Sequence, residues 1–562
     1  MQNRLNLVFQ KFIRLLAKKE HPLVIVLDDL QWADTDSLDL LLSLLTETDL
    51  KYLLVIGTYR DNEVYSSDSL FKTLEKLKLN ETSIKNIILG PLNADNIKNL
   101  LYDTFYLPDE KIIPLAKLIF DKTRGNPFFI NEFLKSLYAK KLINFTYNNI
   151  WHWDIDEIAE MQITENVIEL MVSRLADLSS ATQETLETAA CFGSRFTIDK
   201  LVAGYEKPRK EIFQNLREAI NAGIILSSDN TQRFLHDKVH EATYSLIPEN
   251  EKNLLHYKIG KTLLRNTEEK ELEEFIFDIV NQLNYGSELI EQNEKLELAK
   301  LNLVAGKKAK NSAAFSLALK YFQTGFNLLT KNSWLENYEL TFSLSIELAE
   351  CTYLNANFAE AEILFDETLR NSKSLIEKAR VYETKIILYT AMNKMKEAIS
   401  ISREALKLFK INIPKNNLAI KTATFIELMK ANNSLKKIKI ENLINLPQMS
   451  DQNKLCIMNT IMSTLPPAYF SNTDLMMLLI LKMVNYSLKY GNSNVSSYAY
   501  STYSLVLSFI LNRYNDGYEL TKVALELNEK FKNKKLKAKL NFIYAAMSSH
   551  WVHHVKEGLT LL

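Results

Sequence analysis

The chain has no excess of charge of either sign. Its 562 residues hold 68 lysines and arginines against 68 aspartates and glutamates. Surfaces that bind nucleic acid or anionic membranes as their main task need a net basic face, so this balance argues against both as the main function. Local basic patches are still compatible with it. Hydrophobic residues at 47% and charged residues at 24% are ordinary for a globular protein.

Cysteine and long apolar runs are scarce too. Cys191, Cys351 and Cys456 lie far apart without metal-ligand spacing, which is typical of a reducing cytoplasm and of buried thiols. The most apolar stretches, 475–488 and 498–511, are too short or too often broken by polar residues to cross a bilayer. The sequence therefore predicts a cytoplasmic chain without a membrane span, and its N-terminus has none of the features of a signal peptide.

The scarcity of glycine is the most informative of these shortages. The chain has 13 glycines and none precedes Asp28, so no phosphate loop of the form G-x-x-x-x-G-K-[ST] lies upstream of that residue. The only Gly-Lys-Thr, residues 260–262, is interpreted as a decoy. Residue 255 is a leucine where the loop needs a glycine, and apolar residues at helical spacing surround the tripeptide.

The stretch around which the chain is organised is residues 21–34. Five apolar residues, 23–27, predict a short strand buried on both faces, and two carboxylates, Asp28 and Asp29, follow it. In open α/β sheets ligands bind at the carboxyl ends of the strands. The two acids therefore stand where a magnesium-nucleotide would be held. Asp34 is expected to cap the helix that comes next.

A second buried strand is predicted over residues 52–60, ending in Arg60. One sheet edge would then offer acids for a metal and a guanidinium for phosphate oxygens. The alternative is a purely structural arginine–aspartate pair at the same edge.

Three segments, in this order, resemble one family. Residues 23–34 look like the Walker B segment of the AAA-related signal-transduction ATPases known as STAND proteins, and residues 57–64 look like their sensor-1 strand. Residues 125–129, Gly-Asn-Pro-Phe-Phe, are similar to the glycine-x-proline signature of the small helical lid over the nucleotide base. The residue types are consistent with this resemblance, because Gly125 can end one helix and Pro127 suits the first position of the next.

The resemblance implies roles for four residues and two cofactors, ATP and Mg²⁺. Asp28 would hold Mg²⁺, and Asp29 would orient or deprotonate the attacking water. Arg60 would sense the γ-phosphate. Pro127 would contact the adenine or help to close the lid.

The resemblance also implies that part of the ATPase sheet is missing. In the family, the strand that carries the phosphate loop lies between the sensor-1 strand and a later strand that residues 84–89 resemble. Here the 27 residues before Asp28 read as one amphipathic helix, with apolar residues from Leu5 to Leu16 on its apolar side, and without the missing strand two central strands would lack a partner. We therefore expect a fragment lacking the Walker A half that does not hydrolyse ATP alone. The uncapped apolar residues 558–562 indicate a cut at the C-terminus as well.

Residues 165–250 are expected to form a winged helix, because three helical runs are followed by a two-stranded ribbon. His236-Asp237 then opens a helix and resembles the His-Asp pair of these ATPases. General-base catalysis is one interpretation, but no nucleophile is placed with the pair. A structural cap or a contact between domains is favoured. In the family this unit packs on the ATPase core, so DNA binding is the less favoured use.

Beyond residue 251 the pattern is helical, and small residues recur at a fixed spacing. Ala398 follows Ala361 by 37 positions, near the period of about 34 residues of tetratricopeptide repeats. Pro414 and Pro466-Pro467 are expected to mark breaks between helical pairs. Such repeats stack into a superhelix whose concave face binds peptides or other domains.

The predicted fold class is α/β, a truncated P-loop ATPase sheet, followed by an all-α winged helix and a tetratricopeptide-like helical superhelix. The predicted parts are a partial ATPase core, a helical lid, the winged helix, a helical linker and the repeats, at residues 1–93, 94–164, 165–250, 251–300 and 301–562.

This order of parts looks like the central region of large bacterial signalling proteins that carry a serine/threonine kinase upstream and often GAF and histidine-kinase domains downstream. The chain itself contains no kinase motif. One expected function is a nucleotide-driven switch that acts on protein partners or neighbouring kinase domains. The alternative is a non-enzymatic helical-repeat scaffold with a vestigial ATPase core. A transcription activator would need a terminal DNA-binding domain.

Overall fold

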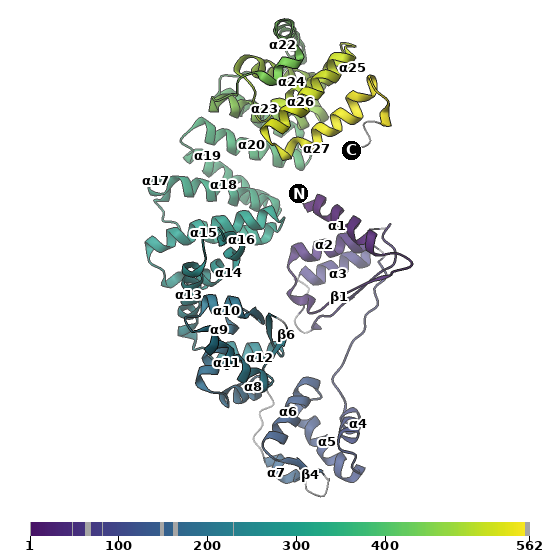
Figure 1. The fold of residues 1–562 in the computed structure, drawn as a ribbon, viewed down its shortest axis with the longest axis vertical. Helices are drawn as coiled ribbons and strands as arrows, with labels where there is room; N and C mark the ends of the chain where they lie inside the picture. The colour runs from purple at the N-terminus through teal and green to yellow at the C-terminus, as the bar shows by residue number, and fades with distance from the viewer. Residues whose placement is uncertain are drawn as a thin grey trace. The chain divides into compact units, whose positions relative to one another are not determined.

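The computed structural model describes residues 2–47, 49–61, 64, 69–80, 82–145, 151–160, 167–228 and 230–556. These residues are mostly helical and form three small sheets (Figure 1). The chain divides into two compact units, residues 1–329 and 330–562, called here the N-terminal and C-terminal units. No helix among the described residues is both long and apolar enough to cross a membrane. The finer division into five parts stays a prediction.

The N-terminal unit begins with a small α/β layer. Its elements are α1 (Gln2–Leu16), β1 (Leu23–Leu27), α2 (Thr35–Leu45), β2 (Leu53–Gly57) and α3 (Ser69–Leu79). The strands pair in parallel, in a register that runs from Leu23 opposite Leu53 to Leu27 opposite Gly57. Asp34 caps α2 by accepting a hydrogen bond from the Ser37 N–H at 2.7 Å, as expected.

The prediction that both strands are buried on both faces is wrong. Exposed and half-buried residues alternate along β1, and Val26 is 63% exposed. Leu54 on β2 is 56% exposed. An apolar run from one sequence shows that a strand is apolar, but burial on its second face depends on a covering element elsewhere in the fold.

Two neighbouring segments extend this uncovered apolar surface. Helix α1 forms as expected, but much of its apolar side, including Val8, Phe12 and Leu15, is exposed, and Ile13 is buried instead. The predicted strand at residues 84–89 is absent, because these residues form no strand, and they are exposed. A strand needs a neighbour to take its backbone hydrogen bonds, and the described residues supply none here.

The next part is a helical bundle with a short ribbon. Its elements are α4 (Ala94–Phe105), α5 (Asp109–Thr123), α6 (Pro127–Ala139), β3 (Ile143–Phe145), β4 (Trp151–Trp153) and α7 (Ile155–Glu160). Strands β3 and β4 pair antiparallel, and residues 146–150 between them lie outside the described part. Trp151 and Trp153 pack on Phe105 with ring centroids 5.1 and 5.2 Å apart.

A mixed unit with a three-stranded antiparallel sheet follows. Its elements are α8 (Val167–Ala176), α9 (Ser180–Ala190), β5 (Arg195–Thr197), α10 (Ile198–Gly204), α11 (Arg209–Asn221), β6 (Ile225–Ser228), β7 (Thr231–Phe234) and α12 (Asp237–Leu246). The sheet order is β5-β7-β6. The ribbon β6–β7 was expected from the sequence. Strand β5 and helix α10 were not, because each is too short to carry a clear periodic pattern.

Four long helices complete the N-terminal unit. They are α13 (Glu249–Asn266), α14 (Leu272–Tyr285), α15 (Gln292–Asn311) and α16 (Phe315–Asn327). In the C-terminal unit the helices are α17 (Ser333–Glu336), α18 (Tyr338–Leu354), α19 (Phe358–Asn371), α20 (Leu375–Ala391), α21 (Met395–Leu408), α22 (Asn417–Lys437), α23 (Gln452–Ser471), α24 (Thr473–Tyr490), α25 (Ser496–Phe509), α26 (Tyr514–Phe531) and α27 (Lys534–Phe542).

Helices of the C-terminal unit pack in consecutive pairs, such as α18 with α19 and α20 with α21. Ala361 and Ala398, the small residues of the repeat pattern, are fully buried. Pro414 lies between helices, as expected. The break predicted at Pro466-Pro467 is wrong, because both prolines lie inside α23. There the burial of neighbouring side chains outweighs the local preference of proline to end a helix.

The last predicted feature, an uncapped C-terminal helix at residues 558–562, lies outside the described residues.

Candidate functional site

The two acids of the central stretch lie at the carboxyl end of β1, beside the end of β2. Asp28 Oδ1 accepts a hydrogen bond of 2.5 Å from the Thr58 hydroxyl. The Asp29 N–H donates to the same hydroxyl oxygen at 3.0 Å. Asp29 has a φ of 58°, in the left-handed region that non-glycine residues seldom adopt. This turn, tied to Thr58, holds both carboxylates at one edge of the strand pair.

Arg60 lies next to these acids, beyond the end of β2. Its Nε is 4.0 Å from Asp29 Oδ1, and its guanidinium is 5.4 Å from the centre of the Trp32 ring. Gln31 joins the two partners, because its amide donates to Asp29 Oδ1 at 2.9 Å and accepts from the Arg60 N–H at 3.3 Å. The structure therefore brings Asp28, Asp29 and Arg60 to one edge, as the strand ends predicted.

Arg60 also connects this edge to α12. Its Nη2 donates to Asp237 Oδ2 at 2.6 Å, and both side chains are about three-quarters buried. His236 caps α12 by accepting a hydrogen bond from the Lys238 N–H at 3.1 Å. Both favoured roles of the His-Asp pair are thus confirmed. His236 caps a helix, and Asp237 forms an ion pair that joins two parts of the N-terminal unit.

The surroundings of His236 lower the pKa of its imidazole. Burial is the main cause, and the positive charge of Arg60 adds to it, while Asp237 and Asp29 act in the opposite sense. The ring stacks on Phe128 with centroids 4.3 Å apart. The Gly-Asn-Pro-Phe-Phe segment therefore reaches the same edge through Phe128.

Pro127 itself lies elsewhere. It is the first residue of α6, which Asn126 caps by accepting a hydrogen bond from the Phe129 N–H at 3.0 Å. Gly125 has a φ of 77°, and a Cβ at this position would clash with the Leu92 carbonyl oxygen. Pro127 lines a largely apolar cavity of about 560 Å³ with Leu92 and Trp151 among others. Its predicted contact with adenine remains a prediction.

The residues at this edge fit one of the two expected cofactors better than the other. Nucleotide-bound Mg²⁺ takes one or two carboxylates together with phosphates and waters, and Asp28 and Asp29 supply such oxygens. A triphosphate needs a cradle of backbone N–H groups and a lysine. Among the described residues the cation beside these acids is Arg60, which Asp237 already engages. The site therefore fits the metal and does not fit the whole nucleotide.

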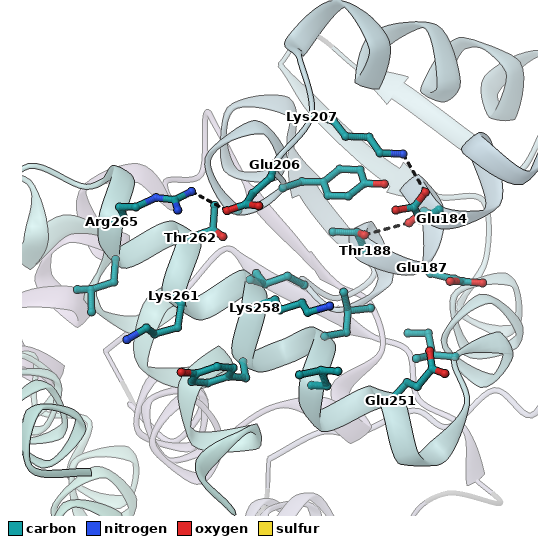
Figure 2. Close-up of a pocket in the computed structure, with 18 of the residues that line it drawn as sticks. Glu184, Glu187, Thr188, Glu206, Lys207, Glu251, Lys258, Lys261, Thr262 and Arg265 are labelled. Atoms are coloured by element: carbon teal, nitrogen blue, oxygen red, sulfur yellow. Dashed lines mark hydrogen bonds and ion pairs between the residues drawn. The ribbon is translucent and has the colours of Figure 1, made fainter. Parts of the chain in front are cut away.

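The Gly-Lys-Thr tripeptide is confirmed as a decoy. It lies within α13, which lines an open cavity of about 870 Å³ (Figure 2). A Cβ on Gly260 would meet Leu283 at 2.7 Å, and Lys261 Nζ is 2.7 Å from Glu294 Oε1. Thr262 is buried. Each residue of the tripeptide thus serves helix packing or an ion pair.

Thr58 and Gln31 complete the site, and the sequence argument did not single them out. A threonine after a strand and a glutamine after two acids are common and carry no pattern. The parallel register places Gly57 opposite Leu27, so Thr58 lies opposite Asp28. That register is the signal that would have pointed to Thr58.

Comparison with known proteins places this geometry in context. Residues 1–56 match the sequence profile described as an AAA ATPase domain. The chain is 25% identical, over 712 aligned positions, to "Hybrid signal transduction histidine kinase G" of Dictyostelium discoideum, an alignment that takes in 100% of this chain and 20% of that protein. It is 22% identical over 279 positions to "Peroxide stress-activated histidine kinase mak3" of Schizosaccharomyces pombe, covering 48% of this chain and 11% of that protein.

The chain thus spans a fifth or less of the length of these relatives. Among solved structures it is similar to a signal transduction ATPase with numerous domains (STAND) with a tetratricopeptide repeat sensor, from Pyrococcus horikoshii, at a TM-score of 0.45 and 13% identity, covering 100% of this chain and 69% of that one. The resemblance drawn from the motifs is confirmed as a similarity: residues 1–56 match the profile of an AAA ATPase domain, and the chain is similar to one region of two histidine kinases.

Proposed function

We propose that the chain is the ATPase-derived switch region of a signal-transduction protein, in which nucleotide controls a helical-repeat surface for protein partners or neighbouring kinase domains. The observation that carries this proposal is the position of Arg60 between Asp29 and Asp237. The guanidinium that would face a γ-phosphate also holds α12. A phosphate and Asp237 would compete for it, so nucleotide binding would loosen α12.

The parts of the switch follow the expected order. Residues 1–93 are the partial P-loop core, 94–164 the lid, and 251–300 the linker to tetratricopeptide-like repeats at 301–562. Residues 165–250 are the winged helix. The order of elements, α9-β5-α10-α11-β6-β7, and the sheet order β5-β7-β6 support that assignment.

The roles of four residues belong to this proposal. In a protein that also supplied the phosphate cradle, Asp28 would hold Mg²⁺, Asp29 would orient or deprotonate the attacking water, Arg60 would sense the γ-phosphate, and Pro127 would contact the adenine or help to close the lid. The chemistry that Mg²⁺ supplies when bound is charge neutralisation on the phosphates. The phosphate cradle has to come from a further polypeptide segment, and the exposed apolar face of β1 and β2 supports this requirement.

A double-mutant cycle on Arg60→Gln and Asp237→Asn tests the carrying contact. A charge-assisted hydrogen bond of this kind is worth about 1.5 kcal/mol or more. We expect a coupling energy of that order, measured by urea unfolding of the two single variants, the double variant and the unmodified chain. A coupling energy near zero would remove the proposed link between the nucleotide edge and α12.

Nucleotide titration by calorimetry tests the incomplete site. We expect no micromolar binding of Mg-ATP to this chain, and micromolar affinity would overturn the assignment of a half-site. In a longer parent protein that contains a phosphate loop, Asp29→Asn should abolish turnover and spare binding. The matched control is Asp103→Asn, an exposed aspartate on α4. Unchanged hydrolysis in the Asp29 variant would reject its catalytic role.

The second candidate is an interaction scaffold in which the ATPase core is vestigial. The poor fit of the described residues at this edge to a triphosphate favours it. An in-frame phosphate loop in the DNA upstream of Met1 would support the switch, and a longer parent that binds no nucleotide would support the scaffold.

A further inference from the structure

Helix α22 of the C-terminal unit carries apolar side chains on two opposite faces. On its inner face Ile420 and Ala431 are buried in the core of the unit. Glu427 anchors the helix to α24, because its carboxylate accepts a hydrogen bond from the Asn485 amide at 2.7 Å. The inner face alone accounts for how the helix is held. The apolar residues on the outer face need another explanation.

The outer face of α22 is an exposed apolar stripe. Leu418 is 76% exposed and Phe425 is 63% exposed, and Met429 is exposed one turn further on. Spacings of seven and four residues put these three side chains on one face of the helix. Ile426 is exposed beside them. Contiguous exposed apolar surface of this kind marks interaction sites in soluble proteins.

Two aromatic residues lie at the N-terminal end of this stripe. The Asn472 amide donates to Asn417 Oδ1 at 3.3 Å, which places the end of α23 beside the start of α22. Tyr469 and Phe470, in the last turn of α23, are exposed there, and Phe470 is 69% exposed. We call Leu418, Phe425, Ile426, Met429, Tyr469 and Phe470 the α22 stripe. Helix α22 is labelled in Figure 1.

Lysines flank the stripe at both ends. Lys415 precedes α22, Lys436 and Lys437 lie in its last turn, and Lys439 follows it, all exposed. Among the described residues the structure records no acidic partner for these four. The acid of α22 itself, Glu427, is largely buried and lies 3.1 Å from Lys430 and 3.6 Å from Lys482. Asp474 of α24 lies 3.7 Å from Lys421 of α22, and Glu441 follows Lys439, but the lysines beside the stripe outnumber these acids, so its local charge is positive.

The charges around the stripe indicate which kind of partner binds to it. Two copies of the chain that met stripe to stripe would bring the same lysines together, and like charges repel. A surface that is both apolar and anionic complements the whole pattern. Aromatic and aliphatic side chains bordered by lysines are the features that hold a helix in the interface of an anionic bilayer.

We propose that the α22 stripe is a docking site for an anionic lipid membrane. The apolar side chains enter the headgroup region while the helix stays attached to the unit through its inner face. The flanking lysines pair with anionic headgroups. The neutral charge of the whole chain does not oppose this binding, because Debye screening limits electrostatic attraction to about 8–10 Å.

Vesicle sedimentation with the full chain tests this proposal. The probes are vesicles of phosphatidylcholine alone and vesicles with about 30% phosphatidylserine, which sets a negative surface potential. We expect binding to the anionic vesicles, weakened by added salt, and little binding to the neutral ones. Phe425→Ser with Met429→Ser should weaken it by about tenfold or more. Lys436→Glu with Lys437→Glu should weaken it by a similar factor.

Matched controls separate the stripe from general effects of the substitutions. Ile363→Ser with Ile387→Ser changes two exposed apolar residues within α19 and α20. Lys76→Glu with Lys78→Glu reverses two lysines in the last turn of α3, as the test pair does in α22. Both control variants should bind anionic vesicles like the unmodified chain.

Three results would overturn the proposal. One is a failure of the unmodified chain to bind the anionic vesicles. Another is equal binding by the stripe variants and the controls. The third is a chain that binds no vesicles but self-associates, as measured by light scattering, and loses that association on Phe425→Ser with Met429→Ser. That result would assign the stripe to an interface between copies.

Discussion

Cys191 is held in a setting that keeps its thiol protonated. The residue lies at the end of α9 and is buried. Burial raises the pKa of the thiol to about 12, and the nearby charge of Glu187 acts in the same direction. Burial likewise raises the pKa of Cys456 to about 11. Since the thiolate is the reactive form, both cysteines should be inert in the folded protein.

Alkylation with iodoacetamide, followed by mass spectrometry, measures this inertness. Near pH 8 a pKa of about 12 in place of about 9 lowers the thiolate fraction of Cys191 roughly a thousandfold. We expect slow labelling in the native state and rapid labelling of all three cysteines in guanidinium. Rapid native labelling of Cys191 would show that it is not buried as described.

His256 is buried, and its neutral imidazole can hydrogen-bond to both of its polar neighbours. Its Nδ1 lies 2.6 Å from Gln282 Oε1 and its Nε2 lies 2.9 Å from the Tyr244 hydroxyl. A neutral ring that donates from Nδ1 and accepts at Nε2 satisfies both partners. Burial lowers the pKa of the imidazole, and the bond to Gln282 opposes this only in part.

The lowered pKa of His256 predicts how stability changes with pH. Below its usual pKa the unfolded chain takes up a proton that the folded chain refuses, so stability is full above that pKa and falls as the pH falls below it. Urea unfolding near pH 7 and near pH 5 measures the loss. His256→Gln should lose less between these pH values than the unmodified chain. His236, whose pKa is also lowered, contributes equally to both proteins. An identical loss in both proteins would contradict the assignment.

At the scale of elements, the polar residues of α14 connect it to five other helices. Asp278 pairs with Lys200 of α10 at 2.8 Å, and Asn281 accepts from the Tyr321 hydroxyl of α16 at 2.9 Å. Asn284 and Asn302 of α15 exchange two amide hydrogen bonds of 3.0 and 2.9 Å. Gln282 bonds to His256 of α13 and donates to the Cys191 carbonyl at 2.8 Å. Helix α14 therefore ties helices of the mixed unit to the long helices α13, α15 and α16.

Gln282→Ala tests this connection. The substitution leaves the His256 ring and the Cys191 carbonyl without their partners in a buried setting, which should cost about 2–3 kcal/mol of unfolding free energy. The matched control is Gln323→Ala on α16, whose amide makes an exposed bond to Asn327, with an expected change within about 0.5 kcal/mol. Equal small effects in urea unfolding would show that α14 does not depend on Gln282.

The strand pair β1–β2 gives a second test at this scale, because its outer face is open. Val26→Thr changes an exposed strand residue and should shift stability by no more than about 0.5 kcal/mol. Leu38→Ala on α2 removes a buried side chain and should cost about 2–5 kcal/mol. A large loss for Val26→Thr, measured by urea unfolding, would mean that something covers this face in solution.

At the scale of the whole molecule, each compact unit has its own core. The N-terminal unit contains two separate clusters of buried side chains, one within residues 92–158 and the other within residues 128–246. A large cluster from Ile399 to Leu540 and a smaller one from Phe342 to Leu388 serve the C-terminal unit. A unit with its own core is expected to fold alone.

Expression of residues 330–562 alone tests this independence. We expect a helical circular dichroism spectrum and a single cooperative thermal transition, because both of its clusters named above consist of residues from this unit. A fragment with helical signal but no cooperative transition would show that the unit depends on residues before 330.

The local features of this protein follow from its sequence alone. The positions of most helices, the caps at Asp34 and Asn126 and the order of motifs follow from spacing and residue type, which act within a few residues of chain. The sequence also placed two acids and Arg60 at strand ends, and a parallel pair must bring such ends to one edge.

Features that depend on distant partners emerge only when the chain is folded. Three outcomes depend on whether another element packs at the segment concerned. They are the exposure of β1, the absence of a strand at residues 84–89 and the continuation of α23 through two prolines. The bond from Arg60 to Asp237, which are 177 positions apart, is of the same kind. Burial and pairing each require contact between two surfaces, and the sequence of a single stretch describes only one of those surfaces.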